Sequence, residues 1–271
     1  MKKIFYLFAS AAIFISACTT NAVTGRRQLS LIPESALQQE AVGQYQSFLQ
    51  QNRIVSNVNN KDAEMVTRVG TRLANAITQY YRSKGLGKEL EGYKWEFNLV
   101  DDKQVNAWCM PGGKVVVYTG LLPVAQNEAA LSIVLGHEIT HAVAHHGQER
   151  MSQAILAQGL QMGGDLFTGG NPQANGIFNQ VFAPSAQIGV LLPNSRNQEY
   201  EADHYGLLFA ALAGYNPREA VAFWTRMANL SNGQQRPPEF LSDHPVDAKR
   251  IEKIKAYMPE ALALYKPMNN R

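Results

Sequence analysis

The segment "LGHEITHAVAHH", residues 135–146, holds four of the six histidines of the chain. His137 and His141 are four residues apart, so on a helix their imidazoles lie on one face and can reach the same ion. Glu138 follows the first histidine, so its carboxylate can reach a water bound to that ion. Zinc lowers the pKa of such a water, and the carboxylate can accept its proton as the water attacks a carbonyl. The spacing therefore predicts a hydrolytic zinc site with Glu138 as base.

The alternative is a pair of solvated histidines on a surface helix. Apolar residues repeat at helical spacing from Ala129 to Val143, which favours a packed helix over an exposed one. A catalytic zinc has three protein ligands and leaves one position open for solvent. A third ligand must therefore come from another part of the chain.

A second polar cluster, "SRNQEYEADHYG", begins at Ser195 and is predicted to be helical. Glu199 and Asp203 share one helix face, whereas Glu201 lies two positions from Glu199 and points away. Glu199 can therefore serve as the third ligand while Asp203 orients a ligand histidine. Without the first motif, an acidic solvated face would be the simpler interpretation of this helix.

His145 and His146 are rival ligands. His145 is eight residues from His137, about 12 Å along a straight helix, which is too far for one ion. Both are interpreted as ordinary polar residues near the end of the helix, where positive charge is favoured. A role for one of them behind a ligand stays open.

Helices are expected at residues 35–51, 61–82, 127–147, 148–162, 195–213, 216–230 and 246–257. The alternating stretch "YKWEFNLV", the segment after it and the β-branched stretch "GKVVVYTG" predict a small antiparallel or mixed sheet. The expected fold is thus α+β and mostly helical, zincin-like, with the sheet beside the helix of the first motif. One domain is expected over residues 35–267. The apolar stretch between Gly176 and Pro193, within a segment spanning 163–193, is interpreted as restricting access to the zinc.

The first 17 residues read as a signal peptide, with Lys2 and Lys3 before a short apolar run. The run ends in "ISAC", which resembles a bacterial lipobox and predicts lipidation of Cys18; an ordinary secretory signal is the alternative. Residues 18–34 are expected to be a tether. Cys109 would then have no disulfide partner, and its apolar surroundings favour a packed side chain over a nucleophile. The formal net charge of +3 is too small to indicate nucleic-acid binding.

The chain resembles zinc metallopeptidase family forty-eight, the CAAX prenyl protease and HtpX-like gluzincins, and looks like its short bacterial lipoprotein branch. The resemblance covers about residues 22–267 and rests on "NAWCMPGGKVVVYTGLL", "EAALSIVLGHEITHAVAHH", "SRNQEYEADHYGLLFAALAGYNP" and "SDHPVDAKRI". It implies one zinc per chain held by His137, His141 and Glu199, with Glu138 as catalytic base and Asp203 as a structural partner. It further implies substrate binding by strand addition at Asn106, Ala107 and Gly113, and stabilisation of the oxyanion by His244 and Arg250. A loop histidine and a surface arginine are the alternative for the last pair.

These observations predict a lipid-anchored zinc endopeptidase of the cell envelope. It would cleave extended or unfolded polypeptide from misfolded or damaged envelope proteins. Thr19 after the lipidated cysteine does not resemble the usual aspartate retention signal, so an outer-membrane location facing the periplasm is expected. The rival hypothesis is a non-proteolytic assembly chaperone or binding lipoprotein with a structural zinc. The intact Glu138 argues against it, because a structural site needs no base.

Overall fold

The computed structural model describes residues 18–157, 172–182, 195–231, 238–245 and 248–267. The predicted signal peptide lies outside the described residues, as does most of the segment interpreted as restricting access. The strands are β1 (Cys18–Thr20), β2 (Arg27–Leu29), β3 (Ile54–Val55), β4 (Glu96–Val100), β5 (Ala107–Met110) and β6 (Lys114–Tyr118). The helices are α2 (Glu34–Gln51), α3 (Lys61–Ser83), α4 (Leu122–Ala125), α5 (Glu128–Val143), α6 (His146–Ala157), α7 (Pro172–Phe182), α8 (Ser195–Leu212), α9 (Glu219–Ser231), α10 (Glu239–Asp243) and α11 (Ala248–Leu264).

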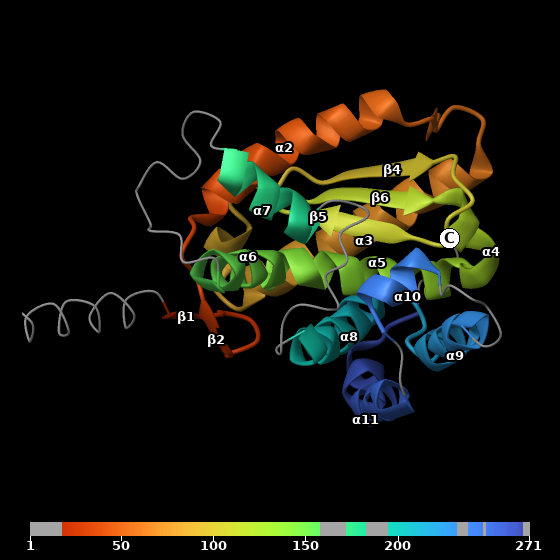
Figure 1. Ribbon diagram of the computed structural model, residues 1–271. Helices are drawn as coiled ribbons and strands as arrows, with labels where there is room; N and C mark the ends of the chain where they lie inside the picture. Colours follow the sequence, from red (N-terminus) through yellow and green to blue (C-terminus); the bar gives the residue numbers. More distant parts are fainter. Residues whose placement is uncertain (1–17, 158–171, 183–194, 232–237, 246–247, 268–271) are drawn as a thin grey trace, which may run out of the picture.

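A four-stranded mixed sheet, ordered β3-β4-β6-β5, forms one layer of the molecule. Strand β4 pairs in parallel with β6, and the other two pairs are antiparallel. Figure 1 shows α2 on one side of this sheet and α3 and α5 on the other. Residues alternate across the strands accordingly: Val115 and Val117 pack in the cluster with α3 and α5, whereas Val116 packs in the cluster with α2. The predicted mostly helical fold with a small mixed sheet is confirmed.

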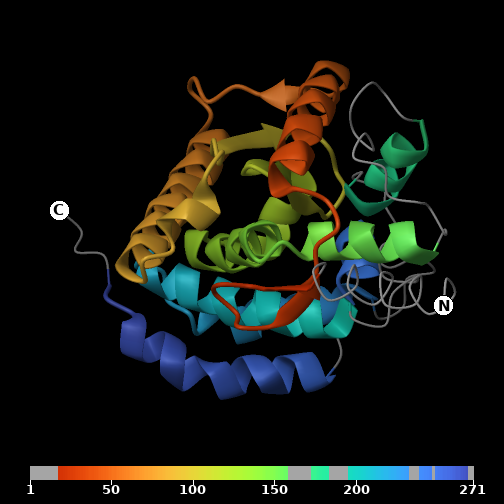
Figure 2. The same cartoon turned by 90° about the vertical axis from the view of Figure 1, so that its left-hand side faces the viewer.

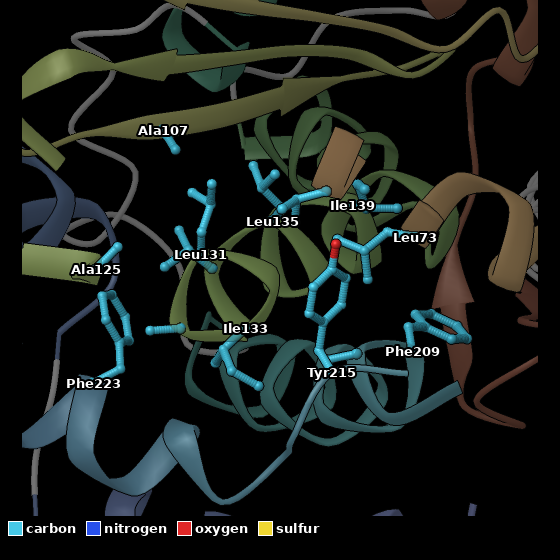
Figure 3. Close-up of a cluster of buried hydrophobic side chains, with 14 of the residues drawn as sticks. Leu73, Ala107, Ala125, Leu131, Ile133, Leu135, Ile139, Phe209, Tyr215 and Phe223 are labelled. Carbon is cyan, nitrogen blue, oxygen red and sulfur yellow. The ribbon is translucent and has the colours of Figure 1, made fainter. Parts of the chain in front are cut away.

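Helix α5 lies at the centre of the molecule, and every residue from Ala130 to Val143 is buried. A helix that is apolar on most sides belongs in a core, which agrees with the burial of α5. Its start is fixed by Asn127, whose side chain accepts a hydrogen bond from Ala130 N at 2.8 Å. Figure 3 shows Leu131 and Leu135 of α5 in one apolar cluster with side chains from other elements. Those labelled from other elements include Leu73 of α3, Ala107 of β5 and Phe223 of α9.

The expected helix over residues 127–147 is shorter than predicted. It ends at Val143, His145 has the left-handed φ of 57°, and α6 begins at His146. On a continuous helix, His146 would project about 140° away from His141. The break instead turns it back toward the end of α5.

The segment expected to be a tether packs against the domain. Strands β1 and β2 form an antiparallel hairpin, which Figure 2 shows in red in front of the teal helix α8 and below the green helix α6. Asn21 is 4% exposed and donates a hydrogen bond to Ala144 O, directly after α5. Tyr205 of α8 donates another to Val23 O. These polar contacts join parts of the sequence more than a hundred residues apart, so no local pattern announces them.

Candidate metal centre

Two glycines bring α5 and α8 into close contact. A Cβ atom at Gly136 would lie 2.7 Å from Gly206 O, and a Cβ at Gly206 would lie 2.7 Å from His137 N. Both obstacles are backbone atoms, so only glycine permits this separation of the two helices. The crossing places the acidic face of α8 directly beside the histidines of α5.

The predicted zinc ligands lie together. His137 Nε2 is 3.1 Å from His141 Nε2, and each of these atoms is 3.4 Å from an oxygen of Glu199. All three side chains are at most 9% exposed. A tetrahedral zinc with bonds of about 2.0–2.1 Å holds its ligand atoms about 3.3–3.4 Å apart. The donor set and its spacing therefore fit zinc.

His244, which directly follows α10, approaches the same point. Its Nδ1 lies 3.2 Å from His137 Nε2 and 3.0 Å from Glu199 Oε2. One atom from each of His137, His141, Glu199 and His244 lies within 4.8 Å of the others. The sequence predicted that the fourth position around the metal is open to solvent. In the structure, His244 Nδ1 is the fourth donor atom at this point.

Glu138 is buried beside these donors and lines a groove. Its Oε1 has no hydrogen-bond partner among the described residues and lies 3.5 Å from His244 Nε2. Burial raises the pKa of Glu138 above its ordinary value, although His244 and His137 oppose the shift. A buried carboxylate oxygen that accepts no hydrogen bond is unfavourable for folding alone and is typical of a functional group.

The local electrostatics favour a bound cation. Burial raises the pKa of Glu199, but His244 and His141 outweigh it and hold the pKa well below the ordinary value. Burial lowers the pKa of His137, yet hydrogen bonds to Asp203 and Glu199 raise it to about 9. Burial holds the pKa of His141 well below its ordinary value. An ionised Glu199 beside a neutral His141 is the state that metal coordination requires, whereas a bound ion has to displace the proton that the raised pKa places on His137.

Asp203 and Arg250 support the centre from behind. Asp203 Oδ1 lies 3.0 Å from His137 Nδ1, the ring nitrogen away from the other donors. Arg250 is 1% exposed, stacks on Trp224 at 3.9 Å and donates to both oxygens of Asp203. It also donates to the carbonyl oxygens of His244 and Pro245. It also forms an ion pair with Glu199 Oε2 at 3.2 Å, so its described contacts hold Glu199, Asp203 and the His244 loop, and its predicted oxyanion role stays a prediction.

The groove runs from the metal centre along strand β5. Its lining includes Asn106, Ala107, Glu138, His141 and His244. Gly113, the third predicted substrate contact, is not part of this lining. It lies in the β5–β6 turn with φ 81°, where a Cβ would meet Trp95 at 2.6 Å. The structure therefore gives Gly113 a turn-forming role, and its substrate role stays a prediction.

Comparison with known proteins agrees with this geometry. Residues 61–258 match the peptidase family M48. The chain belongs to peptidase family M48. It is 35% identical over 182 residues to the mitochondrial metalloendopeptidase OMA1 of Saccharomyces cerevisiae, covering 65% of this chain and 50% of that protein. It is 31% identical over 161 residues to the beta-barrel assembly-enhancing protease of Yersinia pestis, covering 58% of this chain and 33% of that protein.

The chain thus spans about half the length or less of these two relatives. Family membership confirms the predicted resemblance and, with the ligand geometry, the prediction of one zinc site. Among the described residues, no helix combines the length and hydrophobicity needed to cross a lipid bilayer.

Within this M48 domain, His146 has a role that its position in the sequence did not reveal. It is fully buried, and its Nδ1 lies 2.9 Å from His141 Nδ1. The interpretation of His146 as an ordinary polar residue near a helix end is wrong, because its side chain is buried against His141; the open alternative of a role behind a ligand stays a prediction. His145, by contrast, points to Glu34 at 3.2 Å, away from the donors. The helix break between Val143 and His146 produces this difference, and no glycine or proline marks it.

Proposed function

We propose that the chain is a zinc-dependent endopeptidase. The observation that carries the proposal is buried Glu138, whose Oε1 accepts no hydrogen bond from the described residues and which lies beside three zinc-compatible donors and faces a groove. His137, His141 and Glu199 would hold the ion. When bound, zinc supplies Lewis acidity, which activates a water and polarises a carbonyl.

Glu138 acts as the general base and then as the acid. Its raised pKa suits both steps, because a catalytic group works best when its pKa lies near the working pH. Asp203 accepts the hydrogen of His137 Nδ1, which leaves Nε2 free to coordinate. His244 and Arg250 are proposed to stabilise the developing oxyanion. That role requires the His244 ring to turn from the position beside Glu199.

The substrate is proposed to bind as an additional strand beside β5. Strand β5 is an edge of the sheet, with β6 as its neighbour. Tyr118 N donates to Asn106 O, so the alternation of antiparallel pairing turns the backbone groups of Ala107 and Cys109 away from β6. In the structure, the side-chain oxygen of Asn106 accepts from Ala107 N at 2.8 Å. A peptide carbonyl would replace this contact.

The proposed substrates are misfolded or damaged proteins of the cell envelope. Strand addition requires an extended backbone, which a folded protein rarely offers and an unfolded one does. The name of the Yersinia pestis relative places that protein in β-barrel assembly, which supports an envelope role. Anchoring through lipidated Cys18 at the outer membrane is part of the proposal. Cys18 is exposed at the start of β1, as lipidation requires.

A non-proteolytic chaperone with a structural zinc is the second candidate. The position of His244 Nδ1 favours it, because four protein donors around one ion are typical of a structural site. Buried Glu138 favours the peptidase, because a structural site gains nothing from a buried carboxylate oxygen that accepts no hydrogen bond.

The deciding experiment compares the wild type with Glu138→Gln by metal analysis and by cleavage of casein. We expect both to bind one zinc per chain and only the wild type to cleave. Glu128→Gln, on the same helix in an exposed ion pair with Arg68, is the matched control and should cleave. Equal cleavage by wild type and Glu138→Gln, or none by either, would favour the chaperone. A wild type without stoichiometric zinc would refute both functions.

A further inference from the structure

A row of polar side chains connects the ligand His141 to the N-terminal hairpin, and the proposed reaction uses none of them. His146 stands first, with Nδ1 at 2.9 Å from His141 Nδ1 and Nε2 at 3.0 Å from Glu201 Oε2. Arg26 stands next, with Nε donating to the same Glu201 oxygen at 2.8 Å. Its two terminal nitrogens donate to the two oxygens of Glu149 at 2.8 and 2.6 Å. The row therefore spans α5, α6, α8 and the β1–β2 hairpin.

The hydrogen atoms in this row have one arrangement that suits metal binding. An ionised Glu201 only accepts, so His146 donates to it from Nε2. The two Nδ1 atoms that face each other share a single hydrogen. If His146 Nδ1 accepts, then His141 carries its hydrogen on Nδ1 and presents the lone pair of Nε2 to the other donors. The opposite arrangement would place a hydrogen on His141 Nε2 and block coordination.

Arg26 keeps Glu201 in the position that this arrangement needs. Its side chain is 23% exposed, whereas Glu149 is 4% and Glu201 17% exposed. One guanidinium thus joins a carboxylate of α6 to a carboxylate of α8 in a largely buried place. Without it, two acidic side chains would face each other with little water, and Glu201 would be free to turn away from His146.

The hairpin that carries Arg26 is fixed at two further points. Asn21 donates to Ala144 O, and Tyr205 of α8 donates to Val23 O. Gln28 is 3% exposed beside Arg26. These contacts hold Arg26 in place. The docking of the hairpin and the orientation of His141 therefore depend on the same hydrogen-bond network.

We propose that Arg26 is a positioning residue for the metal site, acting on His141 through Glu201 and His146. Docking of the N-terminal hairpin then sets the affinity for zinc, so that a chain whose hairpin is displaced has a weakened metal site. The inference rests on the proposed function in one respect, namely that His141 is a zinc ligand.

The test measures zinc affinity of Arg26→Gln by competition with a chromophoric chelator, with the wild type and Arg27→Gln beside it. Arg27 is the neighbouring residue and is exposed. Its variant makes the same change in charge without removing a contact to Glu201 or Glu149. We expect Arg26→Gln to bind zinc about tenfold more weakly, within the range seen for residues behind metal ligands. Arg27→Gln should match the wild type. Arg26→Lys, which keeps the charge but loses the fork, should recover part of the affinity.

A second readout separates positioning from general stability. The visible absorption of the cobalt-substituted protein reports the ligand geometry, and we expect it to change in Arg26→Gln. Thermal unfolding of the zinc-free proteins measures the stability of the fold alone. Equal zinc affinity and an unchanged cobalt spectrum in Arg26→Gln would overturn the inference while leaving the proposed function intact. A wild type that binds no zinc would overturn the proposed function itself. Should Arg26→Gln not fold, the same two readouts on Arg26→Lys decide.

Discussion

Helix α5 meets α8 on one side and the β5 groove on the other, and the two sides are built differently. Toward α8, the backbones touch at Gly136 and Gly206, and the polar side chains are buried and paired. Toward β5, Ala107 packs against the α5 leucines, and a groove opens beside this contact; Glu138 lines the groove, and its Oε1 accepts no hydrogen bond from the described residues. The first side fixes the proposed ligands, and the second leaves room for the proposed peptide substrate and for Glu138 as the proposed base.

The groups that hold the proposed ligands in place and the proposed base therefore lie on opposite faces of one helix. A change on the α8 side should alter metal binding first and activity as a result. A change on the β5 side should alter substrate affinity or turnover and leave the metal in place. A variant on the β5 side that weakens metal binding, or one on the α8 side that lowers turnover with the metal fully bound, would contradict this comparison.

The largest effect is expected from Gly206→Ala. The new Cβ would lie 2.7 Å from His137 N and 2.8 Å from Gly136 C, so α8 must move away and carry Glu199 with it. Overpacking of this kind costs about 1–3 kcal/mol, which is about a 5- to 150-fold loss if it appears in zinc affinity. Competition with a chelator measures the loss of zinc affinity. Chemical denaturation of the zinc-free protein measures the part of the cost that appears as lower stability of the fold.

Gly43→Ala is the matched control for this substitution. Gly43 lies in α2, and an added Cβ there would meet nothing within 4 Å. Alanine is the better helix former, so this variant should be more stable by about 0.5–1 kcal/mol, with unchanged zinc affinity. Equal zinc affinities in the two glycine variants would show that the close crossing does not position Glu199.

The sequence predicted the ligands because their spacing is local. His137 and His141 follow from one helical turn, and Glu199 from the need for a third donor on a helix face. The close crossing could not be foreseen in the same way, since a glycine inside a helix has no pattern of its own. The partner of Arg26 was equally hidden, because Glu201 lies 175 residues away. The role of His146 depends on the break after Val143, where neither glycine nor proline marks the end of the helix.

A smaller effect on zinc affinity is expected from His244→Ala. Whether kcat also changes shows whether this residue acts only on the metal or also on the reaction. His244 Nδ1 lies among the zinc donors, so we expect zinc binding to weaken about tenfold when it is removed. The proposed oxyanion role adds a lower kcat at saturating zinc, by about 10²- to 10³-fold, which a ligand role alone would not produce. Zinc competition and steady-state kinetics on the same preparations decide between the two.

A still smaller effect is expected from removing one hydrogen bond at the open edge of β5. A peptide substrate with an N-methyl group at the position facing the Ala107 or Cys109 carbonyl loses one donor to the strand. One such bond contributes about 0.5–1.5 kcal/mol, so KM should rise about 2- to 12-fold while zinc affinity and kcat stay unchanged. Methylation at the neighbouring position, which points away from β5, is the control. A KM that is the same for all these peptides would exclude strand addition.

The smallest effect is expected at Cys109, which lies on the groove but outside the reaction. Burial raises the pKa of its thiol well above the ordinary value, so little thiolate forms at neutral pH and alkylation should be slow. Cys109→Ala should therefore keep kcat/KM within about threefold of the wild type, since it removes only a small packed group. Mass-spectrometric mapping of iodoacetamide labelling at Cys109 measures the first expectation, and peptide cleavage measures the second. Rapid labelling of Cys109 that also abolishes cleavage would show a reactive thiol in the groove. Glu138 would then not be the only reactive side chain on the β5 side of α5.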